Sequence, residues 1–339
     1  MKFSKKEFFY KIIFSLFISF FVFFLSKSNI AWLEFWGFLR IPASDPFSDF
    51  KALNIFLKYK ELGFNPYLAN PYSDTIHSVL IYPSIWLYIV DYLNLNKPLN
   101  LEIAILLITF IYLFVLADMF YRFKNKYCKY LIVFFLFSTS NFLLIERLNI
   151  EMILFCLVYF AIISRNFLNQ FIFYNSALIL KIFPLFSIFI FIEKKKQLLI
   201  VLIFSILYLL IIREEIALIK TNIIEYALIF AYGALSISKA IYLYSTKFNF
   251  FINDDNYFIF KNLISFVIGL SAIIIITSNI NFQDKIIKSI SNNEKMFLAG
   301  AGIYIGTFIT SANIDYRLVF LLFTLPIILD YEKQSLKIL

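Results

Sequence analysis

Two acidic residues lie in a polar segment that follows the first long apolar run of this 339-residue chain. The segment reads I-P-A-S-D-P-F-S-D-F-K-A-L and contains Asp45 and Asp49. A carboxylate can accept a proton from a group within hydrogen-bond reach, so both are candidates for acid–base chemistry. The alternative interpretation is that either acid only caps a helix N-terminus.

The residues around Asp49 predict a short helix that positions it. Ser48 and Asp49 precede apolar residues with a period near 3.6, which is typical of an amphipathic helix lying on a membrane surface. A carboxylate in its first turn would be stabilised by the helix dipole. The stretch G-F-N-P-Y from Gly63 predicts the end of this helix, because glycine suits the left-handed position after a C-terminus and proline blocks continuation.

Four basic residues lie in or beside apolar runs or short connections, where a charge is costly unless it meets a cavity or a partner. Three of them have a structural alternative: Lys181 could snorkel to an interface, Arg147 could pair with Glu146 or Glu151, and Arg317 could pair with Asp315 or stack on Tyr316. On a continuous helix, Lys181 would lie roughly 18 Å from Glu193. The four are Arg147, Lys181, Lys239 and Arg317.

The elements that must carry these residues are membrane helices. Hydrophobic residues make up 61% of the chain and charged residues 16%, and the mean hydropathy is +0.82, which excludes a soluble single-domain enzyme. Apolar runs near 20 residues suit a hydrocarbon layer about 30 Å thick. We therefore expect one all-α membrane domain, residues 1–339, with about nine to eleven spans. The candidate spans are Phe8 to Leu25, Val79 to Leu93, Leu101 to Tyr121, Tyr130 to Ile145, Ile150 to Ile163, Phe167 to Ile192 with a break near Pro184, Leu198 to Ile212, Tyr257 to Thr277, Met296 to Thr310 and Ile314 to Leu329. A less regular stretch, Tyr226 to Tyr244, is a candidate interfacial or re-entrant segment.

The charge pattern predicts which side of the membrane each connection faces. The net charge is +9, and basic clusters near Lys126, Lys195, Lys285 and Lys333 should be cytoplasmic, as should the N-terminus. Residues 26–78 then form a long extracytoplasmic loop. All four clusters share one side only if Val79 to Leu93 and the segment around Lys181 and Pro184 do not each cross fully. Trp32, Trp36, Trp86 and Tyr88 near span ends are interpreted as interface anchors.

Other classes of site have little support in the sequence. The chain has two cysteines and one histidine, His77, so neither a disulfide framework nor a His/Cys metal site is expected. Asp254 and Asp255 are adjacent, but no compact set of acidic ligands appears, and dependence on a divalent metal stays open. The basic surplus is typical of membrane topology, and no nucleic-acid partner is expected.

Together these motifs resemble the GT-C superfamily of integral-membrane glycosyltransferases, especially its bacterial polyprenol-phosphate-dependent mannosyltransferases. The matching elements are an Asp in the first outer loop, a G-x-N-P-Y stretch, an aromatic-Pro pair and a K-x-x-P element. Ser84 stands where the family's Y-P-P has its second proline, and E-R-L-N stands where the family often has G-Q-x-N. The matching residues are Asp49, Gly63, Asn65, Pro66, Tyr67, Tyr82, Pro83, Asn149, Lys181 and Pro184.

The resemblance implies transfer of a hexose, such as mannose, from a polyprenyl-phosphate-linked donor to a glycan or glycolipid acceptor outside the plasma membrane of a bacterium. Asp49, or else Asp45, would accept the proton of the acceptor hydroxyl, and an inverting outcome would follow. The four basic residues would bind the donor phosphate. Candidates for loop or acceptor binding are Asn65, Tyr67, His77 and Tyr82.

Two other function classes remain open from the sequence: a transporter or flippase of a lipid-linked glycan, and a structural assembly subunit. A flippase would be favoured by inverted repeats, and no repeat is evident. Asp49, Lys181 and Arg317 should converge on one outward-facing cavity if the transferase interpretation holds. The sequence leaves the sugar, the acceptor and the oligomeric state undefined.

Overall fold

The computed structural model describes residues 5–41, 45–68, 79–222, 231–232, 242, 263, 266–267, 290–310 and 313–329. This part of the chain is helical apart from one antiparallel pair of two-residue strands, β1 (Ala231–Tyr232) and β2 (Asn313–Ile314), so the expected all-α class is confirmed. The first helices are α1 (Lys5–Leu25), α2 (Asn29–Phe38), α3 (Ser48–Glu61), α4 (Ile85–Tyr92), α5 (Pro98–Arg122), α6 (Lys126–Leu136) and α7 (Thr139–Arg147). The later ones are α8 (Glu151–Ile163), α9 (Phe167–Leu180), the 3-10 helix η1 (Phe183–Phe191), α10 (Lys195–Ile211), α11 (Arg213–Asn222), α14 (Asn292–Thr310) and the 3-10 helix η2 (Asp315–Phe323).

Two of the described helices, α1 and α5, are long and apolar enough to cross a membrane. The bent pair α6 and α7, which meet at 52°, makes a third if it forms one span. Most expected spans are therefore shorter helices in the structure. The segment Val79 to Leu93 contains only the eight-residue α4, which is far too short to cross the hydrocarbon layer. The candidate spans Tyr226 to Tyr244 and Tyr257 to Thr277 lie almost wholly outside the described residues.

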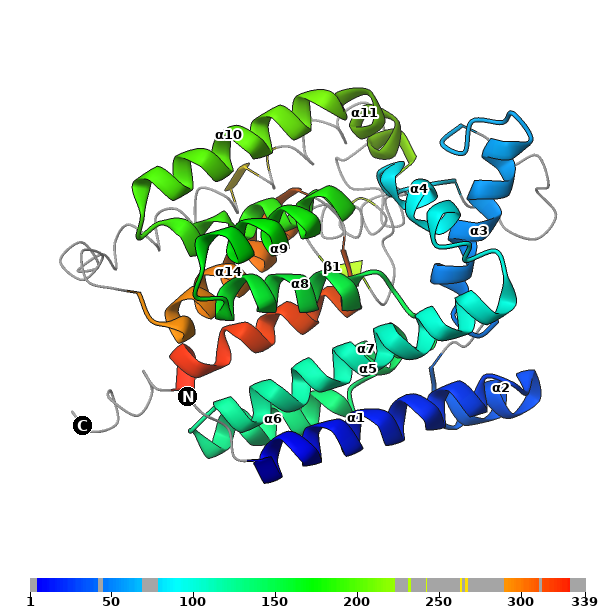
Figure 1. The fold of residues 1–339 in the computed structure, drawn as a ribbon, viewed down its shortest axis with the longest axis horizontal. Coiled ribbons are helices and arrows are strands. Elements are labelled where there is room, and N and C mark those ends of the chain that lie inside the picture. Colours follow the sequence, from blue (N-terminus) through cyan, green and yellow to red (C-terminus); the bar gives the residue numbers. More distant parts are fainter. Residues whose placement is uncertain are drawn as a thin grey trace.

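The long helices form an antiparallel pair that sets the direction of the bundle (Figure 1). Lys11 of α1 donates to Asp118 of α5 at 2.6 Å near one end, and Lys27 pairs with Glu102 near the other. The pairing of the start of α1 with the end of α5 fixes their opposite directions. Helices α2, α3, α4 and α11 gather at the end of the bundle where α1 finishes and α5 begins.

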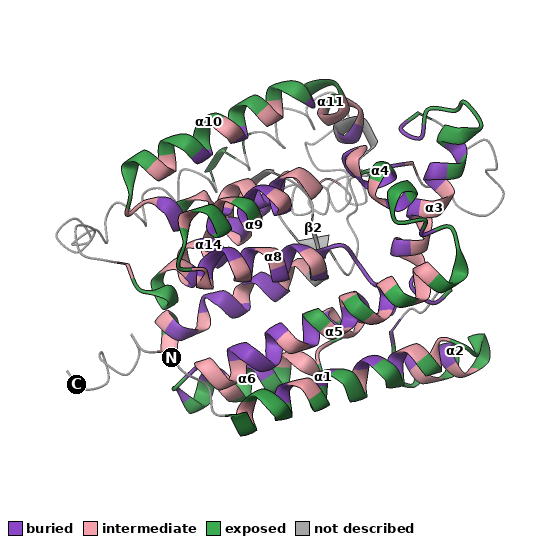
Figure 2. Cartoon of the chain, viewed as in Figure 1, coloured by how far each residue is buried: buried purple, intermediate pink, exposed green. Residues whose placement is uncertain are grey.

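Apolar side chains face outward along α1 and α10, as expected for a lipid-facing surface. Figure 2 shows exposed residues along one face of α1 and of α10. Phe17 and Phe24 of α1 and Leu207 and Ile211 of α10 are each more than half exposed. By contrast, the three tryptophans expected at the interface, Trp32, Trp36 and Trp86, are 2% exposed or less, so that interpretation is wrong.

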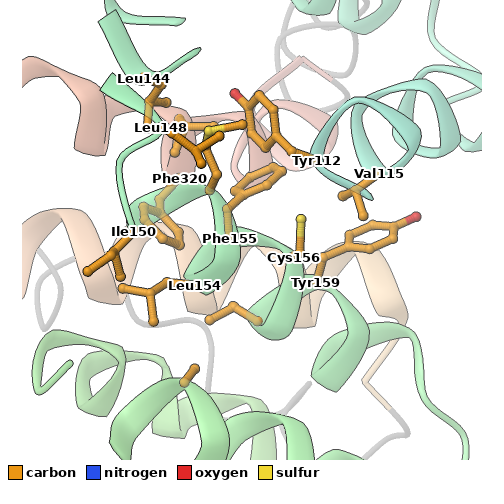
Figure 3. Packing of buried hydrophobic residues seen from close by; sticks show 14 of the residues in the cluster. Tyr112, Val115, Leu144, Leu148, Ile150, Leu154, Phe155, Cys156, Tyr159 and Phe320 are labelled. Atoms are coloured by element: carbon orange, nitrogen blue, oxygen red, sulfur yellow. The ribbon is translucent and has the colours of Figure 1, made fainter. Parts of the chain in front are cut away.

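Helix α8 lies at the centre of the core. The connection that leads into it from α7, residues 148–150, contains part of the candidate site. Tyr112 of α5 and Phe155 of α8 lie side by side in Figure 3, with ring centroids 5.9 Å apart. Phe155 also stacks on Phe323 of η2 at 4.6 Å. Because Glu151 is one helical turn before Phe155, this packing directs the start of α8 towards η2.

The chain turns back on itself between α9 and η1. Helix α9 ends at Leu180, Lys181 has an extended backbone and η1 begins at Phe183, so the break expected near Pro184 is confirmed. The separation of roughly 18 Å between Lys181 and Glu193 along a continuous helix does not apply. Helix α14 packs directly against η1 through glycines, because an added Cβ at Gly302 would lie 2.2 Å from the carbonyl oxygen of Phe186. This close approach leaves no room for a side chain.

We expect Gly302→Ala to lower the free energy of unfolding by about 1 to 3 kcal/mol, the usual range for overpacking in a tight core. The matched control is Gly37→Ala in α2, where an added Cβ meets nothing within 4 Å. Alanine there should be neutral or stabilise by about 0.5 to 1 kcal/mol, because glycine is a poor helix former. Unfolding of both variants in detergent micelles measures the difference, and equal stabilities would show that the interface of α14 with η1 is loose.

Candidate functional site

Asp49 lies in the first turn of α3, as the sequence predicts. The helix is capped at Phe47, whose own side chain makes no capping hydrogen bond, so the alternative that Asp45 or Asp49 is its N-cap is wrong. Phe47 is buried against Trp32, with ring centroids 5.0 Å apart, and this contact anchors the start of the helix. The carboxylate of Asp49 is therefore presented from a fixed helix start.

Asn149 orients the carboxylate. Its Nδ2 donates to Oδ2 of Asp49 at 2.6 Å, and its Oδ1 accepts from the backbone N–H of Glu151 at 3.0 Å at the start of α8. Because α8 holds the oxygen of the Asn149 amide, the nitrogen must point towards Asp49. Asn149 is thus in direct contact with Asp49.

The electrostatic environment of Asp49 combines burial with nearby cations. Its side chain is 20% exposed, and Nη1 of Arg147 lies 3.6 Å from Oδ1, beyond the length of a strong charge-assisted hydrogen bond. Burial raises the pKa of Asp49, and Arg147, the hydrogen bond from Asn149 and the charge of Lys181 oppose that rise. The carboxylate is partly paired but still accessible.

Two residues with left-handed backbone conformations flank this contact. Phe47 has φ 61° and Leu148 has φ 46°, and neither is glycine. The backbone N–H of Phe47 also donates to the carbonyl oxygen of Glu146 at 3.0 Å, which ties the two segments together. Each such conformation costs of order 1–3 kcal/mol and persists only where the surroundings impose it, often at a functional site.

Glu151 is the second centre of the site and was not predicted as one. Its side chain is fully buried, and Oε1 accepts from Lys181 at 2.7 Å and from Arg317 at 3.1 Å. Its other oxygen, Oε2, is buried without a hydrogen-bond partner among the described residues. Two cations therefore share one carboxylate oxygen, which leaves a formal charge of +1 on this trio.

The predicted basic residues occupy different positions in this arrangement. Arg147 lies between Asp49 and Glu146, with its Nε 3.7 Å from Oε2 of Glu146. The alternative in which Arg147 pairs with Glu146 is therefore confirmed. The alternatives in which Lys181 snorkels and Arg147 pairs with Glu151 are wrong. For Arg317, the structure gives a partner 166 residues away, and the side chains of Asp315 and Tyr316 are not described. Lys181, Arg317, Arg147 and Asp49 thus meet around the connection from α7 to α8, while the cavity expected beside them stays a prediction.

The aromatic-Pro pair before α4 is joined to the same cluster. The Lys181 ammonium lies 5.0 Å from the ring centroid of Tyr82. Trp86 donates from its indole to the carbonyl oxygen of Leu180 at 2.9 Å. The backbone just before Lys181 is therefore held by α4, while its ammonium group contacts Glu151 of α8 and the ring of Tyr82.

Glu215 of α11 binds the turn before α4 at Ser84, and this contact was not predicted from the sequence. Glu215 accepts from the backbone N–H of Ser84 at 2.9 Å and from its hydroxyl at 2.6 Å. The hydroxyl of Tyr67 lies 2.9 Å from the carbonyl oxygen of Tyr82 and 3.2 Å from Oε2 of Glu215. Burial raises the pKa of Tyr67, and Glu215 raises it further, so the phenol stays protonated and donates. Proline at position 84 could not donate this backbone hydrogen bond, because it has no N–H group.

The other predicted residues lie outside this cluster or outside the described part of the chain. Asn65 accepts from the backbone N–H of Tyr67 at 3.0 Å and shapes the turn after α3, where Gly63 has φ 83° as expected. Asp45 is exposed at the surface. His77 and Lys239 lie outside the described residues, as do Asp254 and Asp255, and their roles stay predictions.

Comparison with known proteins adds no assignment to this geometry. No family model, no curated protein and no solved structure matches the chain.

Proposed function

We propose that this protein is a membrane glycosyltransferase that moves a hexose from a polyprenyl-phosphate-linked donor to a glycan or glycolipid acceptor. The observation that carries the proposal is the position of Asp49, an accessible carboxylate oriented by Asn149 beside a cluster of three cations. A proton acceptor next to cationic side chains is the pairing that attack on a lipid phosphosugar requires.

The proposal includes a GT-C-like helical bundle of about nine to eleven spans in a bacterial plasma membrane. Lys5 and Lys6 at the start of α1 and Lys126 at the start of α6 lie at the end of the bundle opposite α3. Lys195 at the start of α10 lies at that end too. Basic residues favour the cytoplasmic side, so Asp49 would face the extracytoplasmic side.

The proposed reaction needs a single base. The acceptor oxygen forms a bond to the anomeric carbon while Asp49 takes the hydroxyl proton. The bond between that carbon and the phosphate oxygen breaks, and its electron pair leaves with polyprenyl phosphate. Since phosphate is a good leaving group, no general acid is required. The developing negative charge is stabilised by cations already in place.

Three cations near Asp49 support this proposal. The trio of Glu151, Lys181 and Arg317 carries one more positive than negative charge, and Arg147 lies between Asp49 and Glu146. Nε of Arg147 is buried without a hydrogen-bond partner among the described residues. We assign donor-phosphate binding to Lys181, Arg317 and Arg147, while the same role for Lys239 rests on the sequence alone.

Reconstitution tests the proposal. The protein in lipid vesicles receives a radiolabelled polyprenyl-phosphate hexose, with mannose first, together with a glycolipid acceptor fraction from bacterial envelopes. Label in the acceptor with release of polyprenyl phosphate supports a transferase. Movement of intact donor across the bilayer without transfer would instead support a flippase and contradict the proposal.

The rate of transfer should fall as the pH is lowered, because Asp49 can accept a proton only when its carboxyl group is deprotonated. Burial raises the pKa of Asp49, so the acidic limb of the pH–rate profile should lie at a pH above about 3.9, the pKa of an ordinary aspartate. Arg147 lowers that pKa, so Arg147→Gln should move the limb to still higher pH. A kcat profile against pH for both proteins measures the shift. A limb that stays at the same pH in the variant would contradict the assignment.

A further inference from the structure

A polar cavity lies at the end of the bundle opposite Asp49. Its volume is about 200 Å³, and its lining comes from the turn between α8 and α9, the turn between η1 and α10, and the start of α14 (Figure 1). This volume is below the range of about 300 to 1,000 Å³ that accommodates drug-sized ligands. The cavity therefore suits one small polar group.

The charges around the cavity are mainly positive. Arg165, Lys194 and Lys295 line it, and Glu193 is the single acid among the lining residues. Nζ of Lys295 lies 3.7 Å from Oε2 of Glu193, and both side chains are at least three-quarters buried. Arg165 and Lys194 are exposed and meet no further acid among the lining residues, so the lining carries a formal charge of +2.

Three helices begin beside the cavity, and one of them lacks the usual compensation at its N-terminus. Asn166 caps α9 through its own side chain, and Ser291 and Glu294 cap α14 reciprocally. Helix α10 begins after Lys194 without a side-chain cap, and its first turn contains lysines and no acid. Positive charge at a helix N-terminus is unfavourable, and a bound anion would offset that cost.

From this cavity, its net charge and the start of α10, we propose that the protein binds a phosphate group at this second site. The phosphate oxygens would accept from the guanidinium of Arg165 and the ammonium groups of Lys194 and Lys295. The group could belong to a free phosphate or to the head group of an anionic lipid. This site does not depend on the transferase activity proposed for Asp49.

Binding to the full-length protein tests the site with two probes. Inorganic phosphate is titrated calorimetrically into protein in an uncharged maltoside detergent. Phosphatidylglycerol is offered in phosphatidylcholine nanodiscs, and the lipid retained after extraction is counted by native mass spectrometry. Saturable binding of inorganic phosphate indicates a soluble source, and retention of phosphatidylglycerol alone indicates a lipid head group. Binding of neither probe would overturn the proposal.

Charge variants distinguish binding at this site from non-specific attraction of an anion to basic residues elsewhere on the protein. Arg165→Gln with Lys295→Gln should weaken binding about tenfold or more, because each removes a charge-assisted hydrogen bond. Lys124→Gln with Lys126→Gln is the matched control, since it removes two exposed charges near the same end. Glu193→Gln should strengthen binding, because it removes the acid that competes for Lys295. Equal losses in both double variants, or weaker binding in Glu193→Gln, would overturn the proposal.

Discussion

Asp49→Asn should lower kcat for hexose transfer by about 10²- to 10⁴-fold, the usual contribution of a general base. Asparagine has nearly the same shape and can still bond to Asn149, but it cannot accept the proton of the acceptor hydroxyl. The KM for donor should change little, because the phosphate is assigned to Arg147, Lys181 and Arg317. Initial rates in reconstituted vesicles measure both constants.

The matched control is Asp45→Asn, which removes the second candidate carboxylate. Asp45 is exposed and lies four residues before Asp49. We expect this variant to keep nearly full activity. The opposite pattern, with loss in Asp45→Asn and none in Asp49→Asn, would move the base to Asp45.

Glu151→Gln should lower the free energy of unfolding by about 3 to 5 kcal/mol, the range for removing one partner of a buried ion pair. The loss is large because two cations, not one, would remain without the carboxylate that neutralises them. Lys181 and Arg317 are 14% and 16% exposed, so water can compensate little. Chemical unfolding in mixed micelles measures the change.

Glu102→Gln provides the control for this prediction. Glu102 pairs with Lys27, but both side chains are more than one-third exposed, so the loss should stay below about 1 kcal/mol. Adding Lys181→Met to Glu151→Gln should recover part of the lost stability, since it removes one unpaired cation. A double variant less stable than Glu151→Gln would show that Lys181 has another buried partner.

Local features of the site could be predicted from the sequence because their causes are local. Asp49 in the first turn of a helix and Gly63 after its end both follow from side-chain type and spacing over about 15 residues. The shortness of α4 could be anticipated from the need to keep basic clusters on one side. These features depend on no distant contact.

Glu151 and Glu215 could not be found this way. The partners of Glu151 are 30 and 166 residues distant, and Ser84 is 131 residues from Glu215. One signal was present in the sequence: Glu151 is an acid at the start of an apolar run, where burial demands a cation. The sequence offered several cations and gave no way to choose among them.

The buried tryptophans show a second limit. Trp32 and Trp36 follow the first apolar run, which is where interface anchors occur, but they pack against Phe47 and Phe142 instead. Composition indicates that a tryptophan lies near a membrane boundary and does not show which way it points. Here Phe47, which caps α3, covers Trp32, and Phe142 of α7 covers Trp36. The backbone hydrogen bond from Phe47 to Glu146 holds the start of α3 against α7.

The most direct test of the central claim measures released polyprenyl phosphate and acceptor-bound hexose in the same reconstituted reaction, for the wild-type protein and for Asp49→Asn. The account predicts equal amounts of the two products in the wild type and a parallel fall of both in the variant. Wild-type yields of both products from Asp49→Asn would contradict it, and so would a wild-type protein that forms neither.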